Sequence, residues 1–485
     1  MAGKGRTYPD TKVPTPSQRH MMNRMGCGYS RSTFKAMRRA GSAEEWFESQ
    51  LKPGKVKESR TARQLRSWYP QLRDAPTTKW TNQTSGRKGG WEYAVDLANS
   101  TMMRRIHSER QVLENVVDFW SNHLHVHANS DLGWVHRESY DRVIRKHALG
   151  TFEDMLVEAT LHPAMLLFLD NWRSVRGFPN ENHGRELLEL HTVGRASGYT
   201  EEMVKDSARI LSGFTVDAFK SWKESYDPEK HTTGRVQVLG FTARNDSEDG
   251  RAMTRDYLRY LANHPATAHN IARKLALHYV SDNPSNRVVN DLAKVFRASG
   301  TDIKATLRAL VAHPEFKRSK GRIVRTPVED FVATVRALGI TVRRPTASDS
   351  FARAAVWVPQ STLVYHWPRP DGSPYGNAMW SSPTRMLSSF RLHWNLTAGW
   401  WPTKDARYKK PEKFLPEKEV RLDAWIDHLS RQILGRPAGK RLVKAAVAAV
   451  GYPPGEKVTK DHALAQWLFV RLVGALLDSP DHMQR

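Results

Sequence analysis

The sequence contains a single cysteine, Cys27, among its 485 residues. One thiol cannot form an internal disulfide, and it excludes zinc and iron–sulfur sites that need several cysteines. A Cys-x-x-Cys-His motif is absent too, which excludes covalent haem attachment. Because Cys27 lies between two glycines, we interpret it as a tolerated thiol in a tight loop rather than as a nucleophile.

The sequence also lacks long hydrophobic runs. No unbroken apolar stretch approaches the ~20 residues that a membrane-spanning helix needs. The polar N-terminus, Met1 to Thr7, leads into no apolar segment of the kind that forms a signal peptide. The sequence as it starts therefore predicts a cytoplasmic protein, and export requires that the true start lies further upstream.

Several catalytic motifs are absent. The sequence has no phosphate-binding Walker loop, no Gly-x-Ser-x-Gly nucleophile turn and no His-Glu-x-x-His zinc motif. Any chemistry must therefore come from carboxylates and histidines in another arrangement.

Negative charge is scarce relative to positive charge, which gives a formal net charge of +25. Basic residues cluster around 52–66, 317–325 and 409–413. No helix-turn-helix, zinc-finger or RNA-binding motif accompanies these clusters, so specific nucleic-acid binding is disfavoured. The charge alone indicates a basic protein with non-specific attraction to anions.

The residues that are present favour helices. Ser108 to Gln111 forms a capping box before the apolar stripe of a helix expected over 109–124. Residues 235–241 alternate and predict a short strand or hairpin. Residues 343–415 are rich in Trp, Pro and Ser and lack lysine until Lys404. The sequence predicts a mainly α, multi-helix globular protein with small β-hairpin pieces and an irregular Trp/Pro-rich segment.

Three regions are expected from these changes in composition. Residues 1–90 are interpreted as an N-terminal arm, a helix and an exposed loop over 70–90. Residues 91–320 form a central helical core. Residues 321–485 combine the Trp/Pro-rich segment with C-terminal helices.

Three histidines precede a proline and an apolar helical pattern: His162, His264 and His313. Proline is favoured in the first helical turn, where its missing N–H costs nothing. We therefore interpret these histidines as helix caps rather than as metal ligands.

The densest pattern lies in residues 178–194. Pro179 and Asn180 mark a helix start, and Gly194 marks a stop. At about 100° per residue, His183, Leu187 and Leu190 share one face, and the carboxylates lie on the opposite side. A helix is expected over 180–192, packed in the core near the 109–124 helix, with a substantially buried Glu186 at the boundary of the two faces.

The same residues carry a resemblance. The run from Pro179 to Leu190 resembles the signature of a bacterial family called domain of unknown function 1800. Further pieces match in the same order over nearly the whole chain: Asp118–His123, His162–Leu166, Asp227–Gly234, His264–Ala268, Arg325–Glu329 and Pro370–Tyr375. The resemblance names no reaction.

A functional hypothesis follows from the carboxylates and histidines. Paired carboxylates on one helix can hold a hard cation, and histidines can complete the ligand set. The residues proposed as catalytic are Asn182, Arg185, Glu186 and Glu189. The residues proposed to hold a divalent metal ion are His123, Glu186, Glu189, Asp227 and His231.

A structural interpretation competes with it. Glu181, Arg185 and Glu189 have the spacing of a salt-bridge ladder along one helix stripe. Asn180 and Asn182 can act as helix caps. Buried ion-pair networks resemble functional sites, and both interpretations stay open here.

Three functions remain. The first is a metal-assisted enzyme of the hydrolase type built on the 180–192 helix. The second is a non-catalytic accessory or scaffold protein, for which the resemblance implies a partner of a sulfatase-like family (domain of unknown function 1501). The third is a basic protein that binds anions or polymers, to which the exposed aromatic rings of the Trp-rich segment can contribute.

Overall fold

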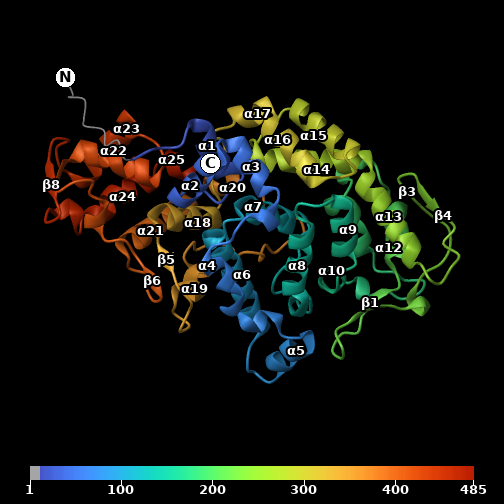
Figure 1. Ribbon diagram of the computed structural model, residues 1–485. Helices are drawn as coiled ribbons and strands as arrows, with labels where there is room; N and C mark the ends of the chain where they lie inside the picture. The colour runs from blue at the N-terminus through green and yellow to red at the C-terminus, as the bar shows by residue number, and fades with distance from the viewer. Residues whose placement is uncertain (1–10) are drawn as a thin grey trace.

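The computed structural model describes residues 11–485, so part of the expected N-terminal arm lies outside the described residues. The fold is mainly α, as predicted, and the described strands pair only in two-stranded antiparallel sheets. Figure 1 shows an elongated molecule with the C-terminal helices at one end and the β-hairpins of the middle of the chain at the other. The N-terminal helices lie between them.

The N-terminal region is helical from residue 16. It contains α1 (Pro16–Arg24), α2 (Arg31–Ala40), α3 (Ala43–Gln50), α4 (Arg60–Gln64) and α5 (Pro76–Thr84). The prediction of an exposed loop over 70–90 is wrong for α5. This helix begins at Pro76, a favourable first-turn residue, and its buried Lys79 donates to the carbonyl oxygen of Val135 at 3.1 Å.

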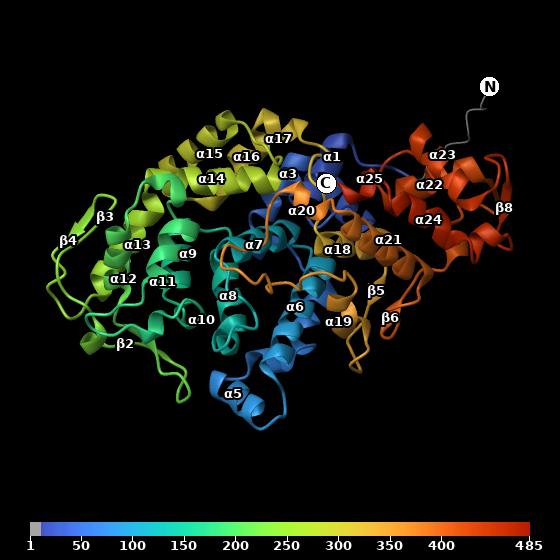
Figure 2. The same cartoon turned by 180° about the vertical axis from the view of Figure 1, so that it is seen from behind.

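The middle of the chain forms two sets of packed helices. The first contains α6 (Gly90–His107), α7 (Gln111–His123), α8 (Arg137–His147), α9 (Phe152–Thr160), α10 (Pro163–Phe168), α11 (Glu181–Glu186) and α12 (Glu201–Leu211). The second contains α13 (Arg251–Asn263), α14 (Pro265–Tyr279), α15 (Asn286–Ala298), α16 (Ile303–Ala312) and α17 (Pro314–Arg318). In both views α14 to α17 run along one edge of the molecule (Figures 1 and 2).

The three histidine caps are confirmed. His162, His264 and His313 occupy the N-cap positions of α10, α14 and α17. In each case Nδ1 accepts the backbone N–H two residues later, at 3.1 to 3.2 Å. These imidazoles therefore replace the hydroxyl or carboxylate that usually satisfies the first turn.

The strands pair in small two-stranded antiparallel sheets. They are β1 (Phe214–Val216), β2 (Glu224–Tyr226), β3 (Val236–Val238), β4 (Phe241–Ala243), β5 (Thr341–Val342), β6 (Ala406–Arg407), β7 (Glu419–Arg421) and β8 (Lys457–Thr459). The predicted hairpin near 235–241 is β3–β4, with Val238 opposite Phe241. Its two-residue turn, Leu239 and Gly240, has positive φ at both positions, as tight hairpins require.

The C-terminal region contains α18 (Pro327–Leu338), α19 (Phe351–Ala354), α20 (Asn377–Trp380), α21 (Pro383–Ala398), α22 (Leu422–Ile433), α23 (Lys440–Val450), α24 (Phe469–Leu477) and α25 (Pro480–Met483). The Trp/Pro-rich segment is largely irregular, but α21 lies within it. Ser382 caps this helix and Pro383 starts it, a local signal that the composition of the segment hides.

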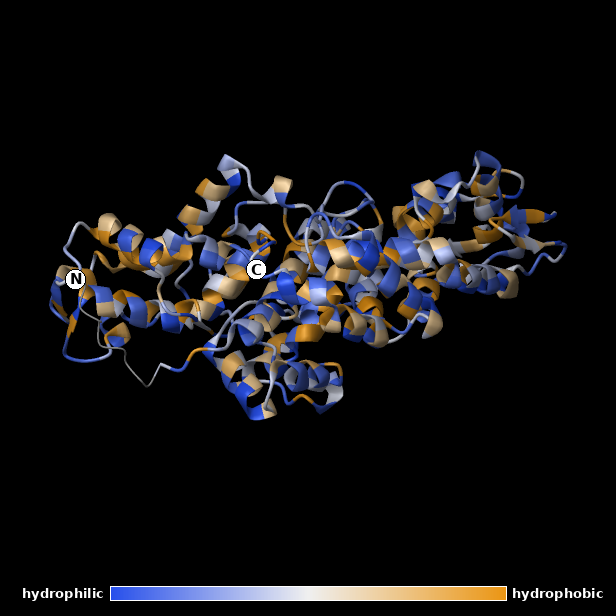
Figure 3. Ribbon diagram, turned by 90° about the horizontal axis from the view of Figure 1, so that it is seen from above, coloured by the Kyte–Doolittle hydropathy of each residue, from blue (hydrophilic) through white to orange (hydrophobic). Residues whose placement is uncertain are grey.

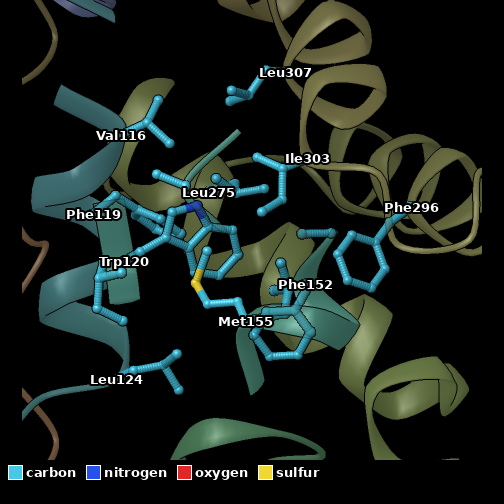
Figure 4. Close-up of a cluster of buried hydrophobic side chains, with 14 of the residues drawn as sticks. Val116, Phe119, Trp120, Leu124, Phe152, Met155, Leu275, Phe296, Ile303 and Leu307 are labelled. Carbon is cyan, nitrogen blue, oxygen red and sulfur yellow. The ribbon is translucent and has the colours of Figure 1, made fainter. Parts of the chain in front are cut away.

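The largest core cluster surrounds Trp120 of α7, which is fully buried. Figure 4 shows its ring between α7 and side chains of α9, α14, α15 and α16. Phe152 of α9 stacks on it with ring centroids 5.4 Å apart. Fully burying side chains of this size stabilises a fold by about 1.5–3 kcal/mol each, so α7 is fixed firmly in the core.

A second core cluster joins distant parts of the chain. Leu97 and Met102 of α6 belong to the same apolar cluster as Phe331 of α18 and Trp425 of α22. Figure 3 shows hydrophobic and hydrophilic stripes alternating around most helices, as helices with one buried face require. No helix among residues 11–485 is long and apolar enough to cross a membrane.

Candidate functional site

The predicted 180–192 helix is present in two parts. α11 covers Glu181–Glu186, with the side chain of Asn180 accepting the N–H of Asn182 at 2.9 Å. The helix then widens into a π-helical turn over Leu187–His191. The hydroxyl of Thr192 donates to the carbonyl oxygen of Leu187 at 2.6 Å, which satisfies a group at the helix end. Such π turns are rare and are frequent at functional sites.

The apolar face of this helix is buried. Leu187 and Leu188 are fully inaccessible, and His183 and His191 lie with them in the core. Neither ring nitrogen of these two histidines has a hydrogen-bond partner among residues 11–485. Burial lowers the pKa of His183 to about 3, so its ring is neutral. The close approach of α12 is permitted by Gly184, where a Cβ would meet the backbone nitrogen of Ala208 at 2.7 Å.

Two of the charged residues proposed as catalytic are paired. Arg185 donates to both carboxylate oxygens of Glu201, at 2.8 and 2.5 Å, and lies 3.5 Å from Glu181. Glu189 forms an ion pair with Arg195 and accepts the hydroxyl of Tyr199 at 3.1 Å. The Glu181–Arg185 part of the salt-bridge ladder is therefore present, whereas Glu189 turns to a partner outside the helix.

Asn182, which is also proposed as catalytic, is exposed on the first turn of α11. Its backbone N–H takes part in the cap formed by Asn180. This placement fits the capping interpretation of the asparagines.

Glu186 differs from its neighbours. The residue is half-buried, and its carboxylate forms no hydrogen bond or ion pair within residues 11–485. Burial raises its pKa, and the negative charges of Glu189 and, more weakly, Asp371 add to the shift. The positive charges of Arg195 and Arg185 act in the opposite direction. Desolvation and nearby negative charge both disfavour the ionised form of a carboxyl group.

His123, at the end of α7, lies beside this helix as predicted. Its Nε2 is 3.0 Å from the carbonyl oxygen of His191, to which only a protonated nitrogen can donate. Nδ1 therefore holds the lone pair and accepts from the amine of Lys274 at 3.1 Å. Burial lowers the pKa of His123 well below its usual range, with a further contribution from Lys274.

Lys274 of α14 is a functional candidate that the sequence interpretation missed. Its amine donates to His123 and to the carbonyl oxygen of Leu190 at 2.9 Å. Burial lowers the pKa of this lysine to about 8, although the negative charge of Asp371 opposes the shift. Part of the amine is therefore unprotonated at physiological pH.

Asp371 lies in a loop that is hydrogen-bonded to α7. The side chain of Asn122 accepts the N–H of Ser373 at 2.7 Å and donates to its carbonyl oxygen at 2.8 Å. Gly372 has φ 74°, and a Cβ there would meet the carbonyl oxygen of Asn122 at 2.3 Å. Only glycine fits this contact, so the loop sequence fixes where Asp371 lies.

A cavity of about 120 Å³ adjoins the loop. Asn122, Ser373 and Tyr375 line it together with Trp367 and Trp380 of the Trp/Pro-rich segment. The lining includes Asn122, the chain neighbour of His123, but none of Glu186, Lys274, His123 and Asp371. We refer to these four residues as the signature site.

The structure does not bring Asp227 and His231 to the signature site. Asp227 caps a short turn by accepting the N–H of Glu229 at 3.1 Å. His231 is fully buried between the carbonyl oxygen of Ser212, 2.9 Å from Nδ1, and the side chain of Asn245, 2.8 Å from Nε2. Both residues fix the loop before β3. The five residues predicted to share a metal ion thus form no common ligand group within residues 11–485.

Comparison with known proteins places the chain in a family. Residues 20–484 match the family described as protein of unknown function (DUF1800). The chain belongs to this family. No match is found among curated proteins or among solved structures.

Three of the pieces that resemble the DUF1800 family contribute residues to the signature site. The Asp118–His123 piece supplies His123, the signature helix supplies Glu186, and the Pro370–Tyr375 piece supplies Asp371. The last piece therefore carried a signal for Asp371. Lys274 belongs to none of the matching pieces. The only sequence signal for it was a charge within the apolar helix that follows His264.

Proposed function

We propose that the protein is an enzyme of the hydrolase type in which Glu186 and Lys274 transfer protons. The observation that carries this proposal is Glu186, a half-buried carboxylate without a partner among the described residues. A residue that served only stability would be paired, as Arg185 and Glu189 are.

The pKa shifts of Glu186 and Lys274 support one general acid and one general base. A carboxyl group with a raised pKa can hold a proton and deliver it to a leaving group. An amine with a pKa of about 8 can accept a proton from water or from a substrate hydroxyl. Asp371 acts on both groups, since its charge raises the pKa of Glu186 and that of Lys274.

The position of His123 supports the same proposal. Its neutral ring orients the amine of Lys274 through Nδ1, and its other nitrogen is fixed on the carbonyl oxygen of His191. With both nitrogens engaged, His123 acts as a positioning residue.

The test begins with a panel of chromogenic carboxylate esters, phosphate esters, sulfate esters and glycosides at pH 6–10. For any substrate that the wild-type protein hydrolyses, Glu186→Gln and Lys274→Met should lower kcat by about 10²–10⁴-fold, the usual contribution of a general acid or base. The matched control is Glu181→Gln, which removes a partly exposed carboxylate, paired with Arg185, from the same helix. Equal rates in all variants would reject the proposal.

Metal content measured on the same samples separates two versions of the mechanism. Unchanged metal in Glu186→Gln supports acid–base chemistry without a metal ion at this carboxylate. Loss of one ion in that variant alone would support the metal-assisted version, with Glu186 as a ligand.

A second candidate function is docking to a protein partner. Leu387 and Phe390 of α21 are 67% and 41% exposed, and the nearby Trp400 and Trp401 are 65% and 41% exposed. Grouped apolar side chains of this kind often mark interaction sites. The partner that the family resemblance implies is a sulfatase-like protein. Co-elution with it should be lost in a Leu387→Ser/Trp400→Ser variant, and undiminished co-elution would contradict this candidate.

A further inference from the structure

Three buried side chains from distant parts of the chain converge near the C-terminus. They are Asp330 of α18, His393 of α21 and His482 of α25, with exposed fractions of 0%, 0% and 4%. One donor atom from each lies within 4.8 Å of the other two. Within residues 11–485 this is the one group of three or more His, Cys, Asp or Glu residues that meets this spacing.

The donor atoms have the spacing of ligands around one ion. Oδ1 of Asp330 is 3.0 Å from Nε2 of His393 and 3.3 Å from Nε2 of His482. Two ligands ~2.1 Å from a zinc ion, at the angles of octahedral or tetrahedral coordination, lie roughly 3.0–3.4 Å apart. The two imidazoles approach edge to face, with ring centroids 5.3 Å apart, and both present Nε2 to Oδ1 of Asp330.

Neighbouring groups hold these ligands in position. Nδ1 of His393 is 2.6 Å from a carboxylate oxygen of Asp478. The second oxygen of Asp330 accepts the hydroxyl of Ser389 at 2.6 Å and the guanidinium of Arg385 at 3.3 Å. Imidazoles that bind metals usually have their other nitrogen on a carboxylate or carbonyl, and ligating carboxylates are themselves hydrogen-bonded. Each partner here engages the atom that faces away from the shared point.

The third ligand is positioned through its backbone. The carbonyl oxygen of His482 accepts from Nε of Arg325 at 2.8 Å, and the carbonyl oxygen of Met483 accepts the N–H of Arg325 at 2.9 Å. These bonds attach α25 to the start of α18 without using the imidazole. The hydroxyl of Thr334 lies 2.9 Å from Nε2 of His482 and adds an oxygen atom beside the same point.

We propose that Asp330, His393 and His482 bind one divalent transition metal ion. Two imidazoles and a carboxylate are ligands that Zn²⁺ accepts, and the burial of all three residues favours a structural role. The ion joins α18, α21 and α25, three helices that meet only in the tertiary structure. The site is separate from the signature site, and no residue belongs to both.

The competing explanation is a cluster held by protons alone. In that case a protonated His393 bridges Asp330 and Asp478, and Arg385 balances the remaining charge. The two explanations differ in metal content and in the effect of His482, which is a ligand in the first and a hydrogen-bonded neighbour in the second.

The experiment uses the full chain, purified, stripped with a chelator and titrated with Zn²⁺. We expect one ion per chain by calorimetry and elemental analysis, and a rise in Tm when zinc is added. Co²⁺ in place of Zn²⁺ should give the visible absorption bands of a site with nitrogen and oxygen ligands. His482→Gln, which keeps a hydrogen-bonding side chain, should lower zinc affinity by at least about 10-fold and remove the rise in Tm.

Two controls make the result specific. His313→Gln alters a partly buried cap histidine outside the cluster, and Glu186→Gln alters the signature site. Both variants should bind zinc at the Asp330 cluster as the wild type does. Wild-type protein that takes up no stoichiometric metal would overturn the proposal. So would a folded His482→Gln variant with unchanged zinc affinity and an unchanged Tm response.

Discussion

The signature site and the Asp330 cluster both place ionisable side chains inside a helical protein, but they compensate charge differently. Asp330 is fully buried and interacts with His393, His482, Ser389 and Arg385. Glu186 is half-buried and has no such partner among the described residues. Full compensation is what a structural element requires, whereas an uncompensated carboxylate is available to a substrate. The contacts of each carboxylate, rather than its residue type, therefore distinguish a structural role from a functional one.

The same substitution at the two carboxylates should give opposite results, and the larger effect belongs to Asp330→Asn. The amide cannot balance Arg385 and His393, which stay buried. We expect the free energy of unfolding to fall by about 3–5 kcal/mol, the usual cost of removing one partner of a buried pair. Urea denaturation of chelator-treated protein measures it. A loss below about 1 kcal/mol would mean that Asp330 is not the centre of its cluster.

Lys274 gives a prediction with a defined pH window. Its folded pKa of about 8 lies below the unfolded value near 10.5, so the unfolded chain binds more protons between these values. The free energy of unfolding should therefore rise with pH through this window, by up to about 3 kcal/mol. Lys274→Met should lack this rise. Urea denaturation of both proteins from pH 7.5 to 9.5 isolates the lysine, and parallel curves would contradict the lowered pKa.

At the signature site, Glu186→Gln should leave the protein folded and slightly more stable, by about 1 kcal/mol or less. The substitution removes a partly desolvated charge and its repulsion from Glu189. It also removes the attraction of that charge to Arg195 and Arg185, so the net gain is small. Thermal and urea unfolding beside Asp330→Asn give the direct contrast. A loss of stability as large as that of Asp330→Asn would show that Glu186 has a structural partner, as Asp330 does.

The smallest effects are expected at the histidine caps. Replacing His162, His264 or His313 by Ser exchanges one cap acceptor for another and should change stability by about 1 kcal/mol or less. Metal content should not change in any of the three. Loss of bound metal on one of these exchanges would place a ligand outside the Asp330 cluster.

Sequence patterns predicted the features that depend on neighbouring residues. The caps at His162, His264 and His313, the β3–β4 hairpin and the helices around Trp120 and Glu186 all follow from residues a few positions apart. The π-helical turn and α5 were missed. The first depends on contacts of the helix with the core, and the second lies in a polar stretch whose burial of Lys79 is not visible locally.

Charge partners, by contrast, were decided by the tertiary structure. The sequence predicted that Glu186 lies at the boundary between two helix faces. Only the fold showed that Glu189 pairs with Arg195. It also showed that His231 is hydrogen-bonded to Asn245 and that Lys274 is hydrogen-bonded to His123. Asp330, His393 and His482 are separated by 63 and 89 positions and share no local motif. Helix formation depends on interactions three or four residues apart, which a sequence displays directly. The pairing of buried charges depends on which helices pack together, and that is fixed only when the core around α7 and α18 has formed.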